Sequence, residues 1–302
     1  MGKFLIGTAS WTDKTLIDSG AFYPKSARSA EDRLRFYAES FPIVEVDSTY
    51  YFPPTEKNAV LWMERTPAHF TFHIKAYSLI TQHPTRPKSL YPDLLKQIEE
   101  ENRSQKSLYI SHLSASAIDE VWKRFADALM PLHSSGKLGV VHFQFPEWFL
   151  PGSRSRDYIL ECKQRLPDYR IAVELRNATW YNPSNLERTM AFFAENAIPV
   201  TSVDMPQGFR SSLPPQPFST AKDLAYVRFH GRNTENWEKK HATATPRFAY
   251  LYDQEELKEW VPKLNDLSET TEEVHVLMNN CYRDYAQRNA RELADLLKEQ
   301  DT

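Results

Sequence analysis

Pairs of polar residues two positions apart recur along this 302-residue chain, with an apolar residue between the members of each pair. The most informative pairs are Glu174 with Arg176 in the stretch VELR, and Arg228 with His230 in the stretch VRFH. Arginine presents a planar fork that binds phosphate or carboxylate, and histidine with glutamate can move a proton near neutral pH. These residue types point to acid–base chemistry on a small anionic ligand.

The elements that must position these residues alternate along the chain. Eight short apolar or β-branched runs are bounded by turn residues and read as strands: 4–10, 43–51, 69–76, 138–146, 170–176, 199–204, 224–231 and 273–280. Segments with helical periodicity lie between most of them: 29–40, 55–66, 116–134, 153–166, 184–197, 254–267 and 283–299. Ser29 and Thr55 are the expected N-caps of the first two helices. The alternation predicts an α/β fold with a parallel sheet. Eight strands favour a (β/α)8 TIM-type barrel forming a single domain over 1–302, with a doubly wound sheet as the alternative.

The polar members of these runs are expected inside the barrel. Alternate side chains of a strand face opposite sides, and the outer face of a barrel packs on helices, so the apolar residues belong outside. The inward set is then Glu45, Asp47, His73, Lys75, His142, Gln144, Glu174, Arg176, Asp204, Arg228, His230, His275 and Asn279. Barrel interiors are normally filled with Val, Ile and Leu, and an unpaired buried charge is strongly destabilising. A polar interior therefore indicates an enzyme or a small-molecule binder.

The predicted site lies at the carboxyl ends of the strands, where the sites of such barrels form. The predicted catalytic residues are Glu174, His230 and Asp47. Glu174 has two interpretations, a general base or a group that only orients the arginines. The predicted ligand-binding residues are Lys75, Gln144, Arg176, Arg228, Arg232, Asn279, Asn280, Trp11, Tyr50, Trp180 and Trp237. The aromatic residues among them could stack on a ring of the ligand or simply pack at the rim.

Two segments break the regular alternation. Residues 77–115 form a long insertion after the third strand, rich in proline and polar residues, and a loop of that length indicates a lid or a binding loop. Residues 205–223 contain four prolines, which argues against a regular helix between the sixth and seventh strands.

Several function classes lack their usual motifs in this chain. The eight glycines give neither GxGxxG nor GxxxxGK, and GxSxG, HExxH and CxxC are also absent. The expected cofactor is therefore none, with a divalent metal as the alternative. The net charge of −3 does not favour nucleic acid, and no apolar run reaches the ~18 residues that a membrane span needs. Two cysteines and the lack of a signal-peptide pattern favour the cytoplasm, and nothing indicates an oligomeric state.

Motifs along nearly the whole chain resemble those of the YecE-like proteins, the family called domain of unknown function 72. They are IGTASW (6–11), FYP (22–24), VEVDSTYY (44–51), WxxRTP (62–67), QFP (144–146), VELRNATW (173–180), YVRFHGRNxxxW (226–237), YLYDQEEL (250–257) and MNNCYRDYAxxN (278–289). The resemblance implies a TIM-barrel fold and no established activity. The family usually has GTSGW where this chain has Ala9 and Ser10 in GTASW, and Asn where this chain has Asp47.

Three functions are compatible with these residues. The first is an enzyme or binder for a small phosphorylated or carboxylated ligand, using acid–base chemistry of a hydrolase, lyase or isomerase without a redox cofactor. The second is a metal-dependent barrel of the endonuclease IV or xylose isomerase kind acting on DNA or sugars, which is an analogy of fold only. The third is a non-catalytic small-molecule-binding protein.

Overall fold

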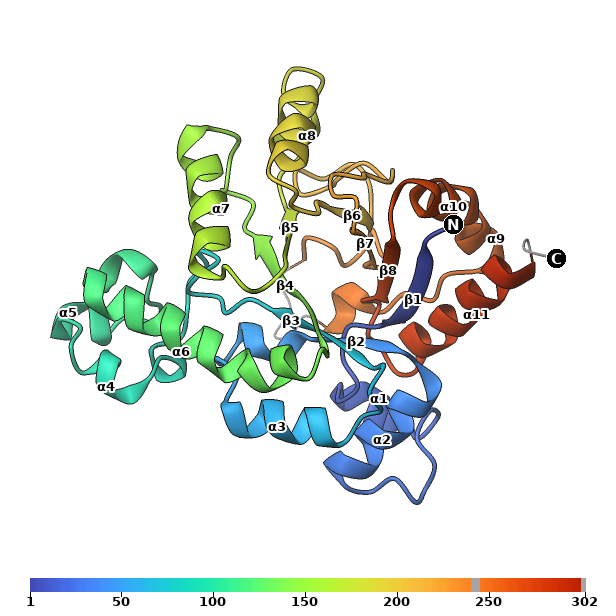
Figure 1. Cartoon of the computed structure of the whole chain (residues 1–302), viewed down its shortest axis with the longest axis horizontal. Coiled ribbons are helices and arrows are strands. Elements are labelled where there is room, and N and C mark those ends of the chain that lie inside the picture. Colours follow the sequence, from blue (N-terminus) through green and yellow to red (C-terminus); the bar gives the residue numbers. More distant parts are fainter. Residues whose placement is uncertain (240–244, 300–302) are drawn as a thin grey trace.

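Eight parallel strands curve around a common axis, with helices on the outside, in a computed structural model that describes residues 1–239 and 245–299 (Figure 1). The strands are β1 (Lys3–Thr8), β2 (Ile43–Val46), β3 (Thr71–Lys75), β4 (Leu138–Phe145), β5 (Ile171–Leu175), β6 (Thr201–Asp204), β7 (Leu224–Phe229) and β8 (Glu273–Met278). They are hydrogen-bonded in the order β5-β4-β3-β2-β1-β8-β7-β6. A single parallel bridge between Val173 and Val200 connects β5 to the start of β6. The nearly closed sheet confirms the predicted (β/α)8 TIM-type barrel.

Helices pack around the outside of the barrel (Figure 1). They are α1 (Lys14–Ser19), α2 (Ala30–Ser40), α3 (Glu56–Glu64), α6 (Ala115–Ser134), α7 (Ser153–Arg165), α8 (Leu186–Glu195), α9 (Gln254–Lys258), α10 (Val261–Thr270) and α11 (Tyr285–Glu299). Ser29 caps α2 with a reciprocal bond from Asp32, and Thr55 caps α3, as predicted. The predicted helix over 254–267 is instead divided into α9 and α10, with Pro262 in the first turn of α10. In the described parts of the chain, every helix is too short or too polar to span a bilayer.

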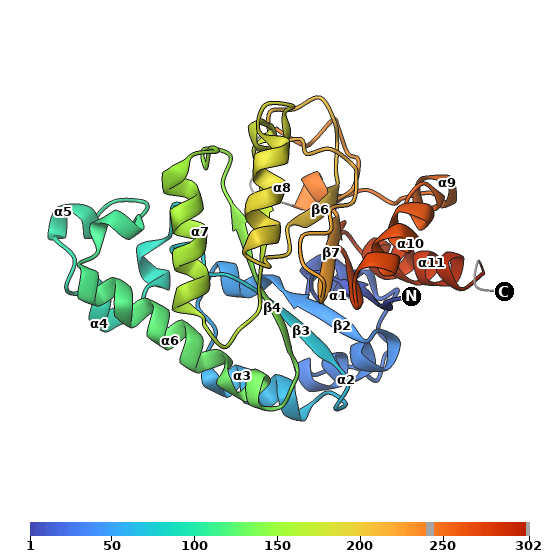
Figure 2. The same cartoon turned by 45° about the horizontal axis from the view of Figure 1, so that its top comes forward.

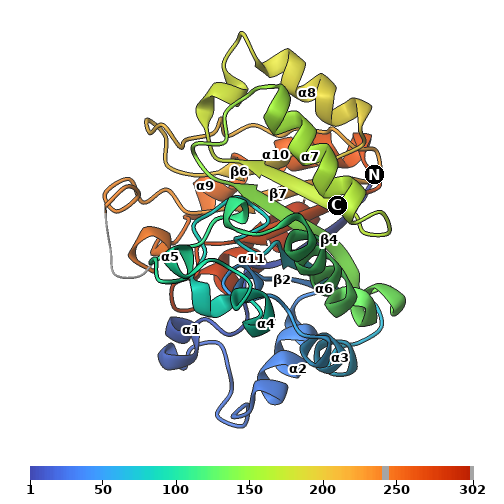
Figure 3. The ribbon, with the colours of Figure 1, turned by 90° about the vertical axis from the view of Figure 1, so that its left-hand side faces the viewer.

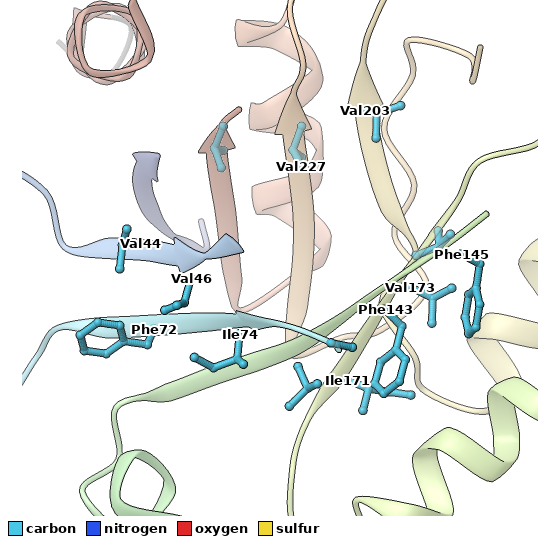
Figure 4. Close-up of a cluster of buried hydrophobic side chains, with 14 of the residues drawn as sticks. Val44, Val46, Phe72, Ile74, Phe143, Phe145, Ile171, Val173, Val203 and Val227 are labelled. Carbon is cyan, nitrogen blue, oxygen red and sulfur yellow. The ribbon is translucent and has the colours of Figure 1, made fainter. Parts of the chain in front are cut away.

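The outer faces of the strands are apolar and pack beneath the helices. Figure 4 shows part of this layer, with Val44 and Val46 of β2, Phe72 and Ile74 of β3, and Phe143 of β4. These residues are fully or almost fully buried, and each alternates along its strand with a residue that faces the barrel axis. The structure therefore confirms which residues of these strands were predicted to face outward and which inward.

The barrel interior changes from apolar to charged along its axis. Its apolar part consists of Leu5, Ile43, Val140, Ala172, Leu224, Tyr226 and Leu277. His73 and His275 are hydrogen-bonded to each other at 2.8 Å, and the buried polar residues of the interior also include Glu45, His142, Glu174, Arg228, His230 and Asn279. Most of the apolar interior thus lies toward the amino ends of the strands, with Leu277 beside Arg228 as the exception, and the charged groups are concentrated toward the carboxyl ends.

The insertion 77–115 is folded against the barrel wall. It contains η2 (Pro87–Ser89), α4 (Pro92–Leu95), α5 (Glu100–Arg103) and η3 (Ile110–His112), and it lies beside α6 and α7 (Figures 2 and 3). Leu90, Leu94 and Leu108 are buried, and Tyr158 of α7 donates its hydroxyl to the backbone oxygen of Ile80 at 2.9 Å. The segment is a packed substructure, and its role as a lid stays a prediction. Residues 205–223 contain no helix, as their prolines predicted.

Candidate functional site

Arg228 lies on the barrel axis and joins two carboxylates. Its side chain is 0% exposed, its Nη2 donates to Glu45 Oε1 at 2.6 Å, and its Nη1 donates to Glu174 Oε2 at 2.7 Å. Tyr226 donates its hydroxyl to the other oxygen of Glu45 at 2.5 Å. Burial acts to raise the pKa of both carboxyls, but Arg228 and the other neighbouring positive groups outweigh it and hold the pKa of Glu45 and Glu174 well below the usual value. The interior therefore holds an ionised and paired triad.

Glu174 also holds a second arginine, Arg176, one layer higher in the barrel. Arg176 Nη1 donates to Glu174 Oε1 at 2.7 Å, and His230 Nε2 lies 3.2 Å from the same oxygen. Asn279 Nδ2 lies 2.8 Å from His230 Nδ1. Since Asn279 donates to Nδ1 in this arrangement, we assign the proton of the neutral ring to Nε2, which donates to Glu174. These four side chains form one hydrogen-bonded layer.

The environment of His230 keeps its ring neutral near pH 7. Burial lowers the pKa of His230 to about 4, and Arg228 and Arg176 act in the same direction against the opposing influence of Glu174. Both ring nitrogens have partners, and neither His230 nor Glu174 is among the described residues that line the cavity above them. The geometry favours the interpretation in which Glu174 orients the arginines. The roles of Glu174 and His230 in proton transfer stay predictions.

A cavity of about 700 Å³ opens above this layer, at the carboxyl ends of the strands. The structure brings six predicted site residues into its lining: Asp47, Tyr50, Lys75, Gln144, Arg176 and Asn279. They come from the ends of β3, β4, β5 and β8 and from η1 (Asp47–Tyr50), the turn that follows β2. The cavity therefore lies where a barrel places its site.

Asp47 and Lys75 form an ion pair in the wall of this cavity. Lys75 Nζ donates to Asp47 Oδ1 at 2.7 Å and lies 5.1 Å from the centroid of the Tyr50 ring. Thr49 donates its hydroxyl to the backbone oxygen of Lys75 at 2.6 Å, which fixes η1 against the end of β3. Both charged groups are partly exposed, so a ligand in the cavity can reach an acid and a base side by side.

A second cavity, of about 360 Å³, adjoins the first and is lined in part by Trp237. Trp237 donates its indole N–H to Ser211 Oγ at 3.0 Å. The guanidinium of Arg176 lies 5.3 Å from the ring centroid of Trp237, and that of Arg247 lies 5.5 Å from it. Two arginines therefore contact one indole, each at a distance typical of a cation–π interaction.

Asp204 was expected in the barrel interior, and this prediction is wrong. Its carboxylate accepts from the Tyr252 hydroxyl at 2.7 Å, from Trp260 Nε1 at 2.7 Å and from Arg232 Nη2 at 2.8 Å. Tyr252 and Trp260 pack against Phe229, the outward-facing residue that is the register partner of Asp204. Because β6 has only four residues, its sequence pattern is too short to show which of its faces points into the barrel. Arg232, a predicted ligand-binding residue, is held by Asp204 on this outer side.

Predicted ligand-binding residues outside the described linings of both cavities include the axial Arg228 and three residues nearer the loops: Trp11, Trp180 and Asn280. Trp180 is buried and donates its Nε1 to the backbone oxygen of Phe149 at 2.6 Å. Asn280 is buried and donates to the backbone oxygen of Tyr250 at 2.9 Å. Trp11 is packed among aromatic rings of the outer core. In this conformation these side chains support the loops around the mouth.

Several residues that line the two cavities were missed by sequence reasoning: Ser10, His83, Glu147, Trp148, Arg247 and Phe248. They belong to loops, which have no periodicity that assigns a direction to a side chain. The sequence feature that could have indicated them was their position in segments that follow strand ends on the C-terminal face. Ser10 has a further distinction, because its φ of 130° lies in a region that favours glycine.

Metal ligation finds no support in the described residues, 1–239 and 245–299, where no group of three or more His, Cys, Asp or Glu side chains is arranged to hold an ion. Around the barrel axis, His142 Nδ1 lies 3.1 Å from Glu45 and its Nε2 lies 3.5 Å from Glu174. The guanidinium of Arg228 occupies the space between these carboxylates and supplies the positive charge there.

Comparison with known proteins identifies the family of this chain. The model of the family described as "Protein of unknown function DUF72" matches residues 5–302. UPF0759 protein YunF of Bacillus subtilis strain 168 is 30% identical over 295 residues, which cover 97% of this chain and 94% of that protein. The crystal structure of the DUF72 family protein EF0366 from Enterococcus faecalis superposes with a TM-score of 0.78 at 27% identity, covering 98% of this chain and 95% of that one. The DUF72 family protein TM1631 from Thermotoga maritima gives a TM-score of 0.75 at 27% identity, covering 98% and 99%. The chain therefore belongs to the DUF72 family, as its motifs predicted.

Proposed function

We propose that this protein binds a small ligand carrying a phosphate or carboxylate group at the mouth of the barrel, and that it performs acid–base chemistry on that ligand. The observation that carries the proposal is the placement of Arg176 and Arg247 on the same indole, that of Trp237, at the junction of the two cavities.

Arg247 is a half-buried cation that lacks a carboxylate partner within the described residues, where its guanidinium lies against the Trp237 ring. Burial lowers the pKa of Arg247, and the nearby positive charge of Arg176 lowers it further. The charge of Arg176 therefore acts against that of Arg247, and an anion bound beside both guanidinium groups would offset this repulsion. Glu147 and Glu238 oppose the effect, but neither forms an ion pair with Arg247.

Arg176 is positioned to share an anion with Arg247. Its Nη1 is held by Glu174, while its Nε and Nη2 donate to no group in the described parts of the chain. Two free N–H groups on one guanidinium are the geometry that accepts a carboxylate or phosphate edge. Lys75, in the wall of the larger cavity, adds a third cation within the same mouth.

Asp47 and Lys75 are the groups best placed for proton transfer. They are paired at 2.7 Å, partly exposed and in the cavity wall. Glu174 and His230, one layer below, act in this proposal through Arg176, whose guanidinium they hold. The reaction types that such a set supports are those of a hydrolase, lyase or isomerase without a redox cofactor.

Calorimetric titration with inorganic phosphate, sulfate and acetate tests the anion site directly. We expect at least one of these anions to bind, and Arg247→Gln to weaken binding at least tenfold, since a charge-assisted hydrogen bond contributes about 1.5–3 kcal/mol. Arg188→Gln is the matched control, because Arg188 is exposed on α8 and outside both linings. Equal affinities in wild type and Arg247→Gln, or no binding of any anion, would contradict the proposal.

Turnover of any ligand found in this way separates catalysis from binding alone. Asp47→Asn should lower kcat by about 10²–10⁴-fold, the usual contribution of a general acid or base. Tight binding without turnover in the wild type would instead indicate the non-catalytic binding protein considered above.

A further inference from the structure

The two cavities at the mouth form one elongated site. Glu147, Arg176 and Arg247 line both of them, so the larger cavity continues into the smaller one across these three side chains. Volumes of about 700 and 360 Å³ exceed what a bare phosphate or acetate fills, and lie in the range of sites for small organic molecules. The anion-binding end is therefore one part of a longer site.

The two ends of this site come from different groups of strands, which meet at the neighbouring strands β4 and β5. One end carries aromatic rings from the loops after β2, β3 and β4: Tyr50, Tyr51, His83 and Trp148. The other end carries guanidinium groups from the end of β5 and the loops after β6 and β7: Arg176, Arg210 and Arg247. In the strand order, β3 and β7 are four strands apart in a sheet of eight, so they face each other across the axis.

Two aromatic rings of the first end are unusually exposed. Trp148 is 58% exposed and Tyr51 is 52% exposed, yet both line the cavity. Burial of such rings in the folded chain would contribute far more to stability than their exposure does. Their position at the cavity mouth is explained by a ligand whose own apolar ring face packs against them.

The wall between the two ends is polar and contains several hydrogen-bond acceptors and donors. Asp47, Gln144 and Asn279 bring a carboxylate and two amides, and Ser10 adds a hydroxyl at a backbone φ of 130°. A serine in this region of φ is strained, and strain of that kind concentrates at functional sites. Amides, carboxylates and a hydroxyl along one wall match a ligand with several hydroxyl groups, each of which both donates and accepts.

We infer that the ligand of this mouth is a carbohydrate that carries a phosphate or carboxylate group. The inference rests on the proposed anion site. The C–H face of the sugar ring packs on Trp148 and its aromatic neighbours, the hydroxyls bond to the central polar wall, and the anionic group lies between Arg176 and Arg247. A sugar ring has the required combination of an apolar face and a polar edge.

Titrations with a small set of probes test this assignment on the full chain. The set consists of inorganic phosphate, a panel of hexose and pentose phosphates, glucuronate, neutral glucose and adenosine monophosphate. We expect at least one sugar phosphate or glucuronate to bind at least tenfold more tightly than inorganic phosphate or acetate, respectively. Neutral glucose should bind more weakly than its anionic counterparts, because it lacks the group that the arginines hold.

The variant Trp148→Ala tests how much the aromatic end contributes to ligand affinity. The side chain is largely exposed, so the variant is expected to fold. It should lower the affinity for the best sugar phosphate about tenfold or more, and lower it more than the affinity for inorganic phosphate. Leu150→Ala is the matched control, because Leu150 is 45% exposed in the same loop and lies outside both described linings.

The outcomes separate this inference from the proposal beneath it. If inorganic phosphate binds through Arg247 but no sugar anion binds more tightly, or if Trp148→Ala behaves like Leu150→Ala, the carbohydrate assignment fails and the anion site stands. If adenosine monophosphate is bound more tightly than every sugar anion, the aromatic end takes a nucleobase and the assignment also fails. If no anion binds at all, both proposals fail together.

Discussion

The barrel axis and the mouth above it hold arginines in opposite ways. On the axis, Arg228 is fully buried, and its two terminal nitrogens donate to Glu45 and Glu174 at 2.6 and 2.7 Å. At the mouth, Arg247 is half-buried beside Arg176, and it forms no ion pair with any residue that the structure describes. The same side chain is thus neutralised by the protein in one place and left for another molecule in the other.

The difference indicates which polar groups of the interior have a structural role. Glu174 is the link between the two regions, because it accepts from Arg228 on one oxygen and from Arg176 on the other. The axial triad therefore fixes the height and direction of Arg176, which forms part of the cavity wall. A buried network placed below a site can hold its residues ready without touching the ligand.

The largest effect is expected from Arg228→Gln. Glutamine does not replace the charge, so Glu45 and Glu174 are left buried without compensation, and breaking a buried pair in this way costs about 3–5 kcal/mol. Urea unfolding monitored by fluorescence measures the change. Adding Glu45→Gln to the variant should restore part of the lost stability, because it removes one of the two uncompensated charges. A loss below about 1 kcal/mol would mean that the triad is not an ionised network.

The second-largest effect is a loss of stability at acidic pH. The pKa of His230 is lowered by burial to about 4, so between pH ~6.5 and ~4 the unfolded chain binds a proton that the folded chain does not. The free energy of unfolding should therefore fall as pH falls through this window, by about 3 kcal/mol from His230 alone. Glu45 and Glu174, whose pKa values are held low by Arg228, add a further loss that begins near pH 4.5 and continues toward their folded values.

Urea unfolding at a series of pH values checks this sign. His230→Gln should give a shallower decline between pH ~6.5 and ~4, because glutamine does not titrate. His69→Gln, at an exposed position, should follow the wild-type curve. A wild-type stability that is constant across this window would contradict the neutral, buried state of His230.

The sequence predicted the fold and the residues of the strand ends because both depend on local periodicity. Alternation within β3, β4, β5 and β7 predicted that Lys75, Gln144, Arg176 and Arg228 face the barrel interior, and their contacts there agree with this direction. The same reasoning placed Asp204 wrongly, because four residues of β6 do not define a face. Its partners, Tyr252 and Trp260, are distant in sequence and could not be foreseen.

The loop residues of the site show the other limit of sequence reasoning. Arg247, Trp148 and His83 follow different strands, and their convergence on one cavity depends on how each loop packs on its neighbours. Arg232 follows β7 in a matching family motif, but its guanidinium is paired with Asp204 on the outer side of β6. Proximity to a strand end predicts the region of a side chain, and tertiary partners decide its direction.

The smallest effect is expected from Arg247→Gln, at the mouth of the barrel. This substitution is the same as that at Arg228, but it removes a half-buried cation that repels Arg176 and has no ion-pair partner among the described residues. The free energy of unfolding should change by no more than about 0.5 kcal/mol or rise slightly, because sites that await a ligand are commonly less stable than they could be. Urea unfolding measures this change, and Arg188→Gln is the control for the loss of an exposed arginine. A loss above about 2 kcal/mol would show that Arg247 is structural. The axis and the mouth would then hold their arginines for the same reason, and the unpaired charge would no longer indicate a ligand.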